Sequence, residues 1–151
     1  MTGVTRKLLL VGIPIVCCIG AVALLIRHIS VTEERNRRVA CLGNLETLRT
    51  AFSNHVVRSG TYPKALDALS PYDLDTKQRL KCLSDRSPSL YDESYSSYLY
   101  TPPTNADVPA TNGILVQERR GIHRGMGDLK PSCGILYIDG RVEMNDCKPN
   151  K

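Results

Sequence analysis

Residues 8–26 read LLLVGIPIVCCIGAVALLI, nineteen positions without a charged or strongly polar side chain. A helix of about 20 such residues crosses the roughly 30 Å hydrocarbon core of a bilayer. We therefore predict a membrane-spanning helix over this stretch. A cleaved signal peptide is the alternative, but the apolar run exceeds the usual core of such peptides, and no small-x-small cleavage site follows before Arg27.

The residues after the span predict a second, amphipathic segment of helix. Apolar residues recur there at spacings of three and four, with polar residues between them: Leu42, Leu45, Leu48, Phe52 and Val56. The pattern predicts a helix over residues 32–59 that Gly60 ends and that Pro63 keeps from resuming. Neither Gly nor Pro lies between residues 26 and 40, so we expect one long helix with Gly43 as its weakest point.

The rest of the chain predicts a small α+β head. Short helical turns are expected at residues 65–69 and 76–83, and four short apolar runs predict strands at residues 98–100, 113–118, 134–138 and 141–144. The fold class is thus a long N-terminal helix packed on a small antiparallel sheet that ends in a hairpin.

The pair Asp139-Gly140 separates the last two predicted strands. An Asp-Gly pair is a strong hairpin signal, because both central positions of a two-residue turn take positive φ. We predict that Ile138 pairs with Arg141. This register places one set of side chains against the helix: Ile135, Tyr137, Val142 and Met144.

Four cysteines follow the span: Cys41, Cys82, Cys133 and Cys147. The hairpin register carries Cys133 to within one residue of Cys147, so we predict a disulfide between them, and Cys41 with Cys82 is left by elimination. Four cysteines allow three connectivities, and the sequence leaves that choice open. An even number in a small domain fits an oxidising compartment.

The net charge and the length of the chain limit its number of domains and its possible partners. The chain has 151 residues, about one domain, and a formal net charge of +5 with acidic residues interleaved. The basic clusters at residues 35–38 and 119–120 are interpreted as solvated surface or headgroup contacts, so no nucleic-acid partner is expected. Arginines on the far side of the span argue against an external head, whereas the cysteines argue for one, and we favour the external placement.

Three motifs occur in the order found in one known superfamily. The long helix carries Cys41-Leu42-Gly43-Asn44-Leu45, its end is followed by Gly60-Thr61-Tyr62-Pro63, and the last hairpin reads Ile135-Leu136-Tyr137-Ile138-Asp139-Gly140-Arg141-Val142-Glu143. Together they resemble the type IV pilin and type II secretion pseudopilin superfamily, above all its prepilin-like branch in planctomycete and verrucomicrobial bacteria. His123 is the candidate for the His that normally precedes the last hairpin of that branch.

The resemblance implies a pilin-like fold and a structural, non-enzymatic role in type II secretion or pilus-type assembly. Residues 1–7 would be cytoplasmic, 8–26 would form a single-pass signal anchor in the inner (cytoplasmic) membrane, and 27–59 would continue the helix outside. Residues 60–151 would form the periplasmic or extracytoplasmic head. Implied partners are the membrane and other pilin-like or secretion-system subunits, contacted through the N-terminal helix.

Two alternatives stay open. Counted from Gly12, the position at which pilins carry an assembly glutamate is Cys17, and Pro14 also lies within the anchor. This departure favours a stand-alone anchored extracytoplasmic domain that does not polymerise. An extracytoplasmic enzyme is the third hypothesis.

Metal-binding and catalytic patterns are sparse. We assign no catalytic residue, cofactor or metal site, because no phosphate loop, zinc spacing or nucleophile elbow occurs. His123 with Asp139 is a candidate cation pair, and Asp128, Asp139 and Glu143 offer the oxygen ligands that Ca²⁺ takes, as in a C-terminal loop of related pseudopilins. The turn alone accounts for Asp139, which is the interpretation we prefer.

Overall fold

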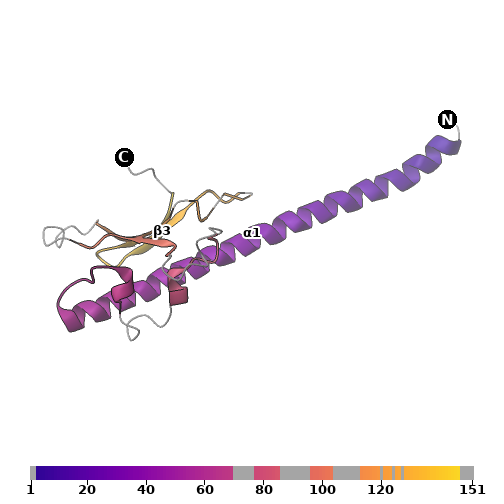
Figure 1. Cartoon of the computed structure of the whole chain (residues 1–151). Coiled ribbons are helices and arrows are strands. Elements are labelled where there is room, and N and C mark those ends of the chain that lie inside the picture. Colours follow the sequence, from indigo (N-terminus) through magenta and orange to yellow (C-terminus); the bar gives the residue numbers. More distant parts are fainter. Residues whose placement is uncertain are drawn as a thin grey trace.

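The computed structural model describes residues 3–69, 77–85, 96–103, 113–119, 121–123, 125–126 and 128–146, and side chains from residue 14 onward except at 77 and 78. One long helix and a four-stranded antiparallel sheet make up the fold (Figure 1). The predicted α+β class is confirmed.

Helix α1 runs from Gly3 to Ser59 and contains 57 residues. At about 1.5 Å per residue it is about 86 Å long. The predicted span and the predicted amphipathic segment therefore form one continuous helix, as the absence of Gly and Pro between them indicated. Gly60 follows the helix with a φ of 74° and donates its backbone N–H to the carbonyl of Val56 at 2.8 Å, which is a left-handed C-terminal cap.

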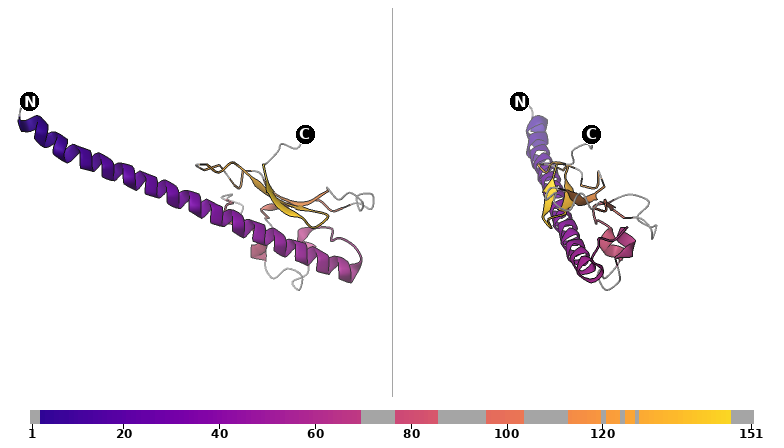
Figure 2. Two further views of the ribbon diagram at one scale, coloured as in Figure 1. Left: turned by 180° about the vertical axis from the view of Figure 1, so that it is seen from behind. Right: turned by 90° about the vertical axis from the view of Figure 1, so that its left-hand side faces the viewer.

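The sheet packs against one side of the second half of α1, and the first half projects away from the head (Figures 1 and 2). The strands lie side by side in sequence order, each antiparallel to the next. They are β1 (Tyr98–Tyr100), β2 (Ile114–Glu118), β3 (Cys133–Tyr137) and β4 (Val142–Asn145). All four predicted strands are present, with bounds shifted by about one residue.

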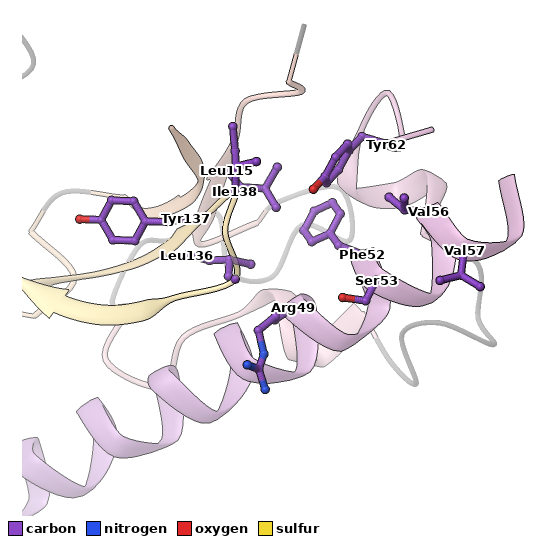
Figure 3. A pocket seen from close by; sticks show the side chains of 11 residues that line it. Arg49, Phe52, Ser53, Val56, Val57, Tyr62, Leu115, Leu136, Tyr137 and Ile138 are labelled. Atoms are coloured by element: carbon purple, nitrogen blue, oxygen red, sulfur yellow. The ribbon is translucent and has the colours of Figure 1, made fainter. Parts of the chain in front are cut away.

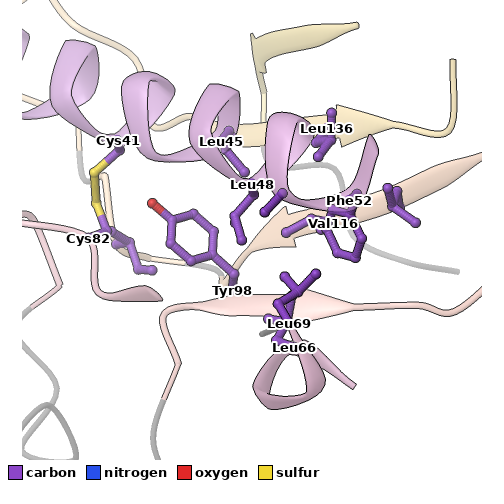
Figure 4. Packing of buried hydrophobic residues seen from close by; sticks show 13 residues of the cluster. Cys41, Leu45, Leu48, Phe52, Leu66, Leu69, Cys82, Tyr98, Val116 and Leu136 are labelled. Atoms are coloured by element: carbon purple, nitrogen blue, oxygen red, sulfur yellow. A yellow bond between two sulfur atoms is a disulfide. The ribbon is translucent and has the colours of Figure 1, made fainter. Parts of the chain in front are cut away.

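A stripe of fully buried or nearly buried residues on α1 forms the centre of the core. Its members are Cys41, Leu45, Leu48 and Phe52, spaced four, three and four residues apart. Val116 of β2, Leu136 of β3 and the ring of Tyr98 lie against them (Figure 4). Since burying one leucine contributes about 1.5–3 kcal/mol, this stripe fixes the sheet on the helix.

Two single turns of 3-10 helix cover the other side of the core. They are η1 (Leu66–Ala68) and η2 (Lys77–Leu80), where the sequence predicted short helical turns. Leu66 and Leu69 are buried beneath α1 (Figure 4).

The register predicted for the last hairpin is wrong by one residue. Leu136 pairs with Val142 and Gly134 with Met144, and the N–H of Tyr137 donates to the carbonyl of Arg141 at 2.9 Å. Three residues, 138–140, therefore form the loop. Only its glycine takes a positive φ, 87° at Gly140. This is the loop length at which a type I turn is followed by a glycine in the left-handed region.

Because neighbouring side chains of a strand point to opposite sides, this one-residue difference in register reverses which face of β3 lies toward the helix, compared with the prediction. Leu136 and Val142 pack into the core on the helix side. Tyr137, which was predicted to face the helix, lies on the other face, where the guanidinium of Arg141 is 4.6 Å from its ring centroid. Ile135 shares that outer face by alternation.

Gly134 of β3 faces Leu45 of α1 with no room for a side chain. A Cβ atom there would be 2.6 Å from Cδ1 of Leu45 and 3.1 Å from the carboxyl carbon of Glu118. We expect Gly134→Ala to destabilise the fold by about 1–3 kcal/mol through overpacking. Gly43→Ala is the matched control, since nothing lies within 4 Å of that site and alanine favours helix by about 1 kcal/mol. The unfolding temperature should fall for Gly134→Ala and rise for Gly43→Ala. An equal change in both variants would contradict the packing argument.

The predicted disulfide between Cys41 and Cys82 is confirmed, with the two Cα atoms 5.4 Å apart. It joins α1 to the segment that follows η2 (Figure 4). Cys133 of β3 is buried and disulfide-bonded. Its expected partner, Cys147, lies outside the described residues, so the Cys133–Cys147 pairing stays a prediction.

Removing the Cys41–Cys82 disulfide should destabilise the head. The bond closes a loop with a sequence separation of 41, and disulfides of this kind contribute about 2–4 kcal/mol, largely by restricting the unfolded chain. The double variant Cys41→Ser, Cys82→Ser is expected to unfold at a lower temperature in detergent micelles. The double variant Cys17→Ser, Cys18→Ser removes two free, exposed thiols and should leave that temperature unchanged.

Candidate functional site

Three ionisable side chains are buried together beside the disulfide. They are Glu34, Glu118 and His123, which we call the acid–histidine cluster, with exposed fractions of 8%, 1% and 0%. Buried charges are costly unless they are paired and hydrogen-bonded. The contacts of each member therefore decide what the cluster can do.

Glu34 comes from α1, where it continues the buried stripe toward the N-terminal, apolar half of the helix. Positions 34, 38, 41 and 45 are four, three and four residues apart, so they lie on one helix face. Oε2 of Glu34 accepts a hydrogen bond from the hydroxyl of Ser84 at 3.3 Å, and Oε1 lies 3.5 Å from Nε of Arg38.

Glu118 is the last residue of β2 and points to the same side as Val116, toward α1. Its Oε2 accepts a hydrogen bond from the backbone N–H of Gly134 at 2.6 Å. Its Oε1 is buried and, among the described residues, makes no well-formed hydrogen bond; Nε2 of His123 lies 3.4 Å away from it. Gly134 thus makes room for both a core leucine and this carboxylate.

His123 lies between β2 and β3 and joins the two carboxylates. Its Nδ1 is 2.9 Å from Oε1 of Glu34, and its Nε2 is 3.4 Å from Oε1 of Glu118. Burial alone lowers the pKa of His123, but the hydrogen bonds and negative charges of Glu118 and Glu34 outweigh it, so this pKa lies above its ordinary value. A positive His123 offsets one of the two carboxylate charges, and Arg38 lies beside Glu34 as a second cation.

The disulfide forms one wall of the cluster. Sγ of Cys82 is 3.5 Å from Nε2 of His123. The two sulfur atoms, a carboxylate oxygen of Glu118 and a ring nitrogen of His123 all lie within 4.8 Å of one another. Helix α1, strand β2, the segment that carries Cys82 and the segment that carries His123 therefore meet at one buried polar centre.

A hydrogen-bonded serine fixes the segment that carries Cys82. The hydroxyl of Ser97 accepts a bond from the backbone N–H of Cys82 at 2.9 Å and donates to Asp85 Oδ2 at 2.7 Å. All three residues are buried. The position of the sulfur relative to His123 is consequently set by the fold.

The structure does not bring the predicted cation ligands together. Asp139 accepts hydrogen bonds from the guanidinium and backbone N–H of Arg141, at 2.7 and 3.0 Å, which lower the pKa of its carboxyl. Glu143 binds the same guanidinium at 3.1 Å, and Asp128 pairs with Arg35 at 2.9 Å. Within the described part of the chain, none of these three carboxylates joins His123 in a group of possible metal ligands.

A separate groove of about 270 Å³ lies at the end of α1 farthest from the span (Figure 3). Phe52, Val56, Tyr62 and Ile138 supply much of its apolar lining, and Arg49 is its charged side chain. No member of the acid–histidine cluster lines it.

The first half of α1 carries the second functional feature. Large apolar side chains there are 53–69% exposed: Ile15, Val16, Ile19, Val22, Leu24, Leu25, Ile26 and Ile29. Among the described residues, one helix is long and apolar enough to cross a membrane, and none of its most apolar window is buried against the head. Gly20 lies on this segment with open space around it.

Sequence reasoning singled out His123 but missed both of its carboxylate partners. Two signals were available: Glu34 occupies the helical stripe of Cys41 and Leu45, and Glu118 alternates with Val116 on the strand.

Known protein families, characterised proteins and solved structures were compared with the chain, and none matches.

Proposed function

We propose that this chain is a membrane-anchored, pilin-like structural or interaction protein of a bacterial envelope, of the secretion or pilus-assembly kind. The observation that carries the proposal is the bare apolar half of α1, which projects from a folded head (Figure 2). Exposed apolar surface of this size marks a site that lipid or another protein covers. A length of about 20 apolar residues suits a bilayer.

The disulfide supports an extracytoplasmic head in this proposal. Cys41–Cys82 is buried in the core, and such bonds persist in oxidising compartments. We therefore place the head on the periplasmic or outer side of the cytoplasmic membrane, with the short N-terminus inside.

Lateral contact with partner helices would use the same apolar segment. Small residues let helices approach closely in a bilayer, and Gly20 offers such a position with nothing within 4 Å. The buried position of His123 supports a non-enzymatic role, because its ring is fully covered by the fold.

The stand-alone anchored domain is the second candidate. Cys17 stands where pilins carry the glutamate that pairs with a neighbouring subunit. Without that carboxylate the anchor would hold the head at the membrane and need no second subunit.

Crosslinking in membranes separates the two candidates. A photo-crosslinker at Leu24, which is 68% exposed, is expected to give ladders if subunits pack through their anchors. Gly20→Ile should reduce the ladders by blocking close approach, whereas Val22→Ile, at another exposed position, should not. A strictly monomeric species would refute assembly and favour the stand-alone domain.

A further inference from the structure

The buried centre beside α1 holds four side chains of metal-ligating type. They are Cys41, Cys82, Glu118 and His123, all buried. In the oxidised protein the two sulfurs are joined, and a disulfide sulfur is not the thiolate that binds metals. The donor set would be complete only in the reduced protein.

The distances around His123 match those of a tetrahedral zinc site. Zinc binds sulfur at about 2.3 Å and nitrogen or oxygen at about 2.0–2.1 Å, which places neighbouring ligand atoms roughly 3.3–3.6 Å apart. Here Nε2 of His123 is 3.5 Å from Sγ of Cys82 and 3.4 Å from Oε1 of Glu118. The cysteine Cα atoms, 5.4 Å apart, allow separated thiolates to reach the roughly 3.8 Å that two zinc–sulfur bonds require.

The surrounding hydrogen bonds orient the donors. Nδ1 of His123 faces Glu34 at 2.9 Å, the arrangement that directs the opposite nitrogen of a metal-binding histidine at its ion. Nε2 faces the Cys82 sulfur at 3.5 Å and Oε1 of Glu118 at 3.4 Å, and within the described part of the chain that oxygen makes no well-formed hydrogen bond. A cation at this point would satisfy all of them.

We propose that reduction of the Cys41–Cys82 disulfide converts this centre into a binding site for one divalent ion of the zinc class. Glu118 and His123 complete the ligand set, and Glu34 acts as a positioning residue through the imidazole. With a phosphine as reductant, the S–S bond breaks, phosphorus is oxidised to the phosphine oxide with oxygen from water, and two thiols form. The ion then displaces both thiol protons and any proton on Nε2, which pass to the buffer.

The proposal goes beyond anchoring and assembly, because it gives the head two alternative crosslinks through the same core. The disulfide is the crosslink when Cys41 and Cys82 are oxidised, and the bound ion is the crosslink when they are reduced. The disulfide joins α1 to the segment after η2, and the ion would join these two to β2 as well, through Glu118.

Cobalt titration of the full-length protein in micelles tests the site. The background carries Cys17→Ser and Cys18→Ser, the protein is reduced with a phosphine under mild denaturation, and the denaturant is then removed. Reduced protein is expected to bind one equivalent of Co²⁺ with thiolate-to-cobalt charge-transfer bands and to release it to zinc. Oxidised protein should show no such bands.

Variants locate the ion. Cys41→Ser with Cys82→Ser keeps Cys133 and Cys147, and it should abolish the bands. Glu34→Gln keeps all four ligands and is expected to weaken binding about 10–100-fold. This variant keeps the test decisive if a variant that removes a ligand, such as His123→Ala, does not fold. His55→Ala is the control and should bind normally. Bands that persist without Cys41 and Cys82, or no bands in the reduced wild-type protein, would overturn the proposal.

Discussion

Two aspartates in the apolar half of α1, Ile19→Asp and Val22→Asp, are expected to release the protein from the membrane. Each charge near the centre of a spanning helix costs about 2.5–3.5 kcal/mol, or roughly 5–7 kcal/mol for the pair. Both side chains are more than half exposed in the isolated chain, at 64% and 55%, so the head loses no contact. The measurement is the fraction of full-length protein that stays in the membrane pellet after alkaline carbonate extraction.

The control places the same charge on the same helix outside the predicted span. Val39 and Val57 are 68% and 86% exposed, and Val39→Asp with Val57→Asp should leave the protein in the pellet. Mass spectrometry of the extracted protein reports the mature N-terminus and so tests the signal-peptide alternative. Wild-type protein in the aqueous supernatant would be the contrary outcome.

Replacing His123 by leucine should be the most damaging single change in the head. The substitution leaves Glu34 and Glu118 buried without their shared partner, and breaking a buried ion pair in this way costs about 3–5 kcal/mol. Adding Glu34→Gln and Glu118→Gln should recover part of the loss, because the buried negative charges are then gone. Near-ultraviolet circular dichroism of the tyrosines during thermal unfolding provides the measurement, with His55→Leu as the control.

The raised pKa of His123 predicts how the stability of the folded protein changes with pH. The pKa of His123 is raised in the folded protein, above an unfolded value of about 6.5. Its charge therefore contributes stability in full below about pH 6.5, and this contribution is lost as the pH rises through the folded-state pKa. Thermal stability should fall as the pH rises above about 6.5 in the wild-type protein and in His55→Leu. His123→Leu should lack this fall, and an equal fall in that variant would contradict the assignment.

The position of the hairpin turn could not be fixed from local sequence. Asp139-Gly140 is compatible with a two-residue loop or with the three-residue loop that is observed. The run from Ile135 to Ile138 has no polar residue to mark the outer face, so alternation does not distinguish the two registers. Packing of Leu136 and Gly134 against α1 selects one.

The sequence by itself determined the long helix, the strands and the apolar run, because each depends on periodicity or run length. The Cys41–Cys82 pairing was one of three connectivities that the sequence left open, and the fold selected it. The acid–histidine cluster was decided only by tertiary structure. Glu34 and His123 are 89 positions apart in the chain, and a charged residue on a helix reads as solvated until a sheet is known to cover it. What makes these ordinary polar residues a single site is the close packing of β2 and β3 on α1, which removes water and leaves them only one another as partners.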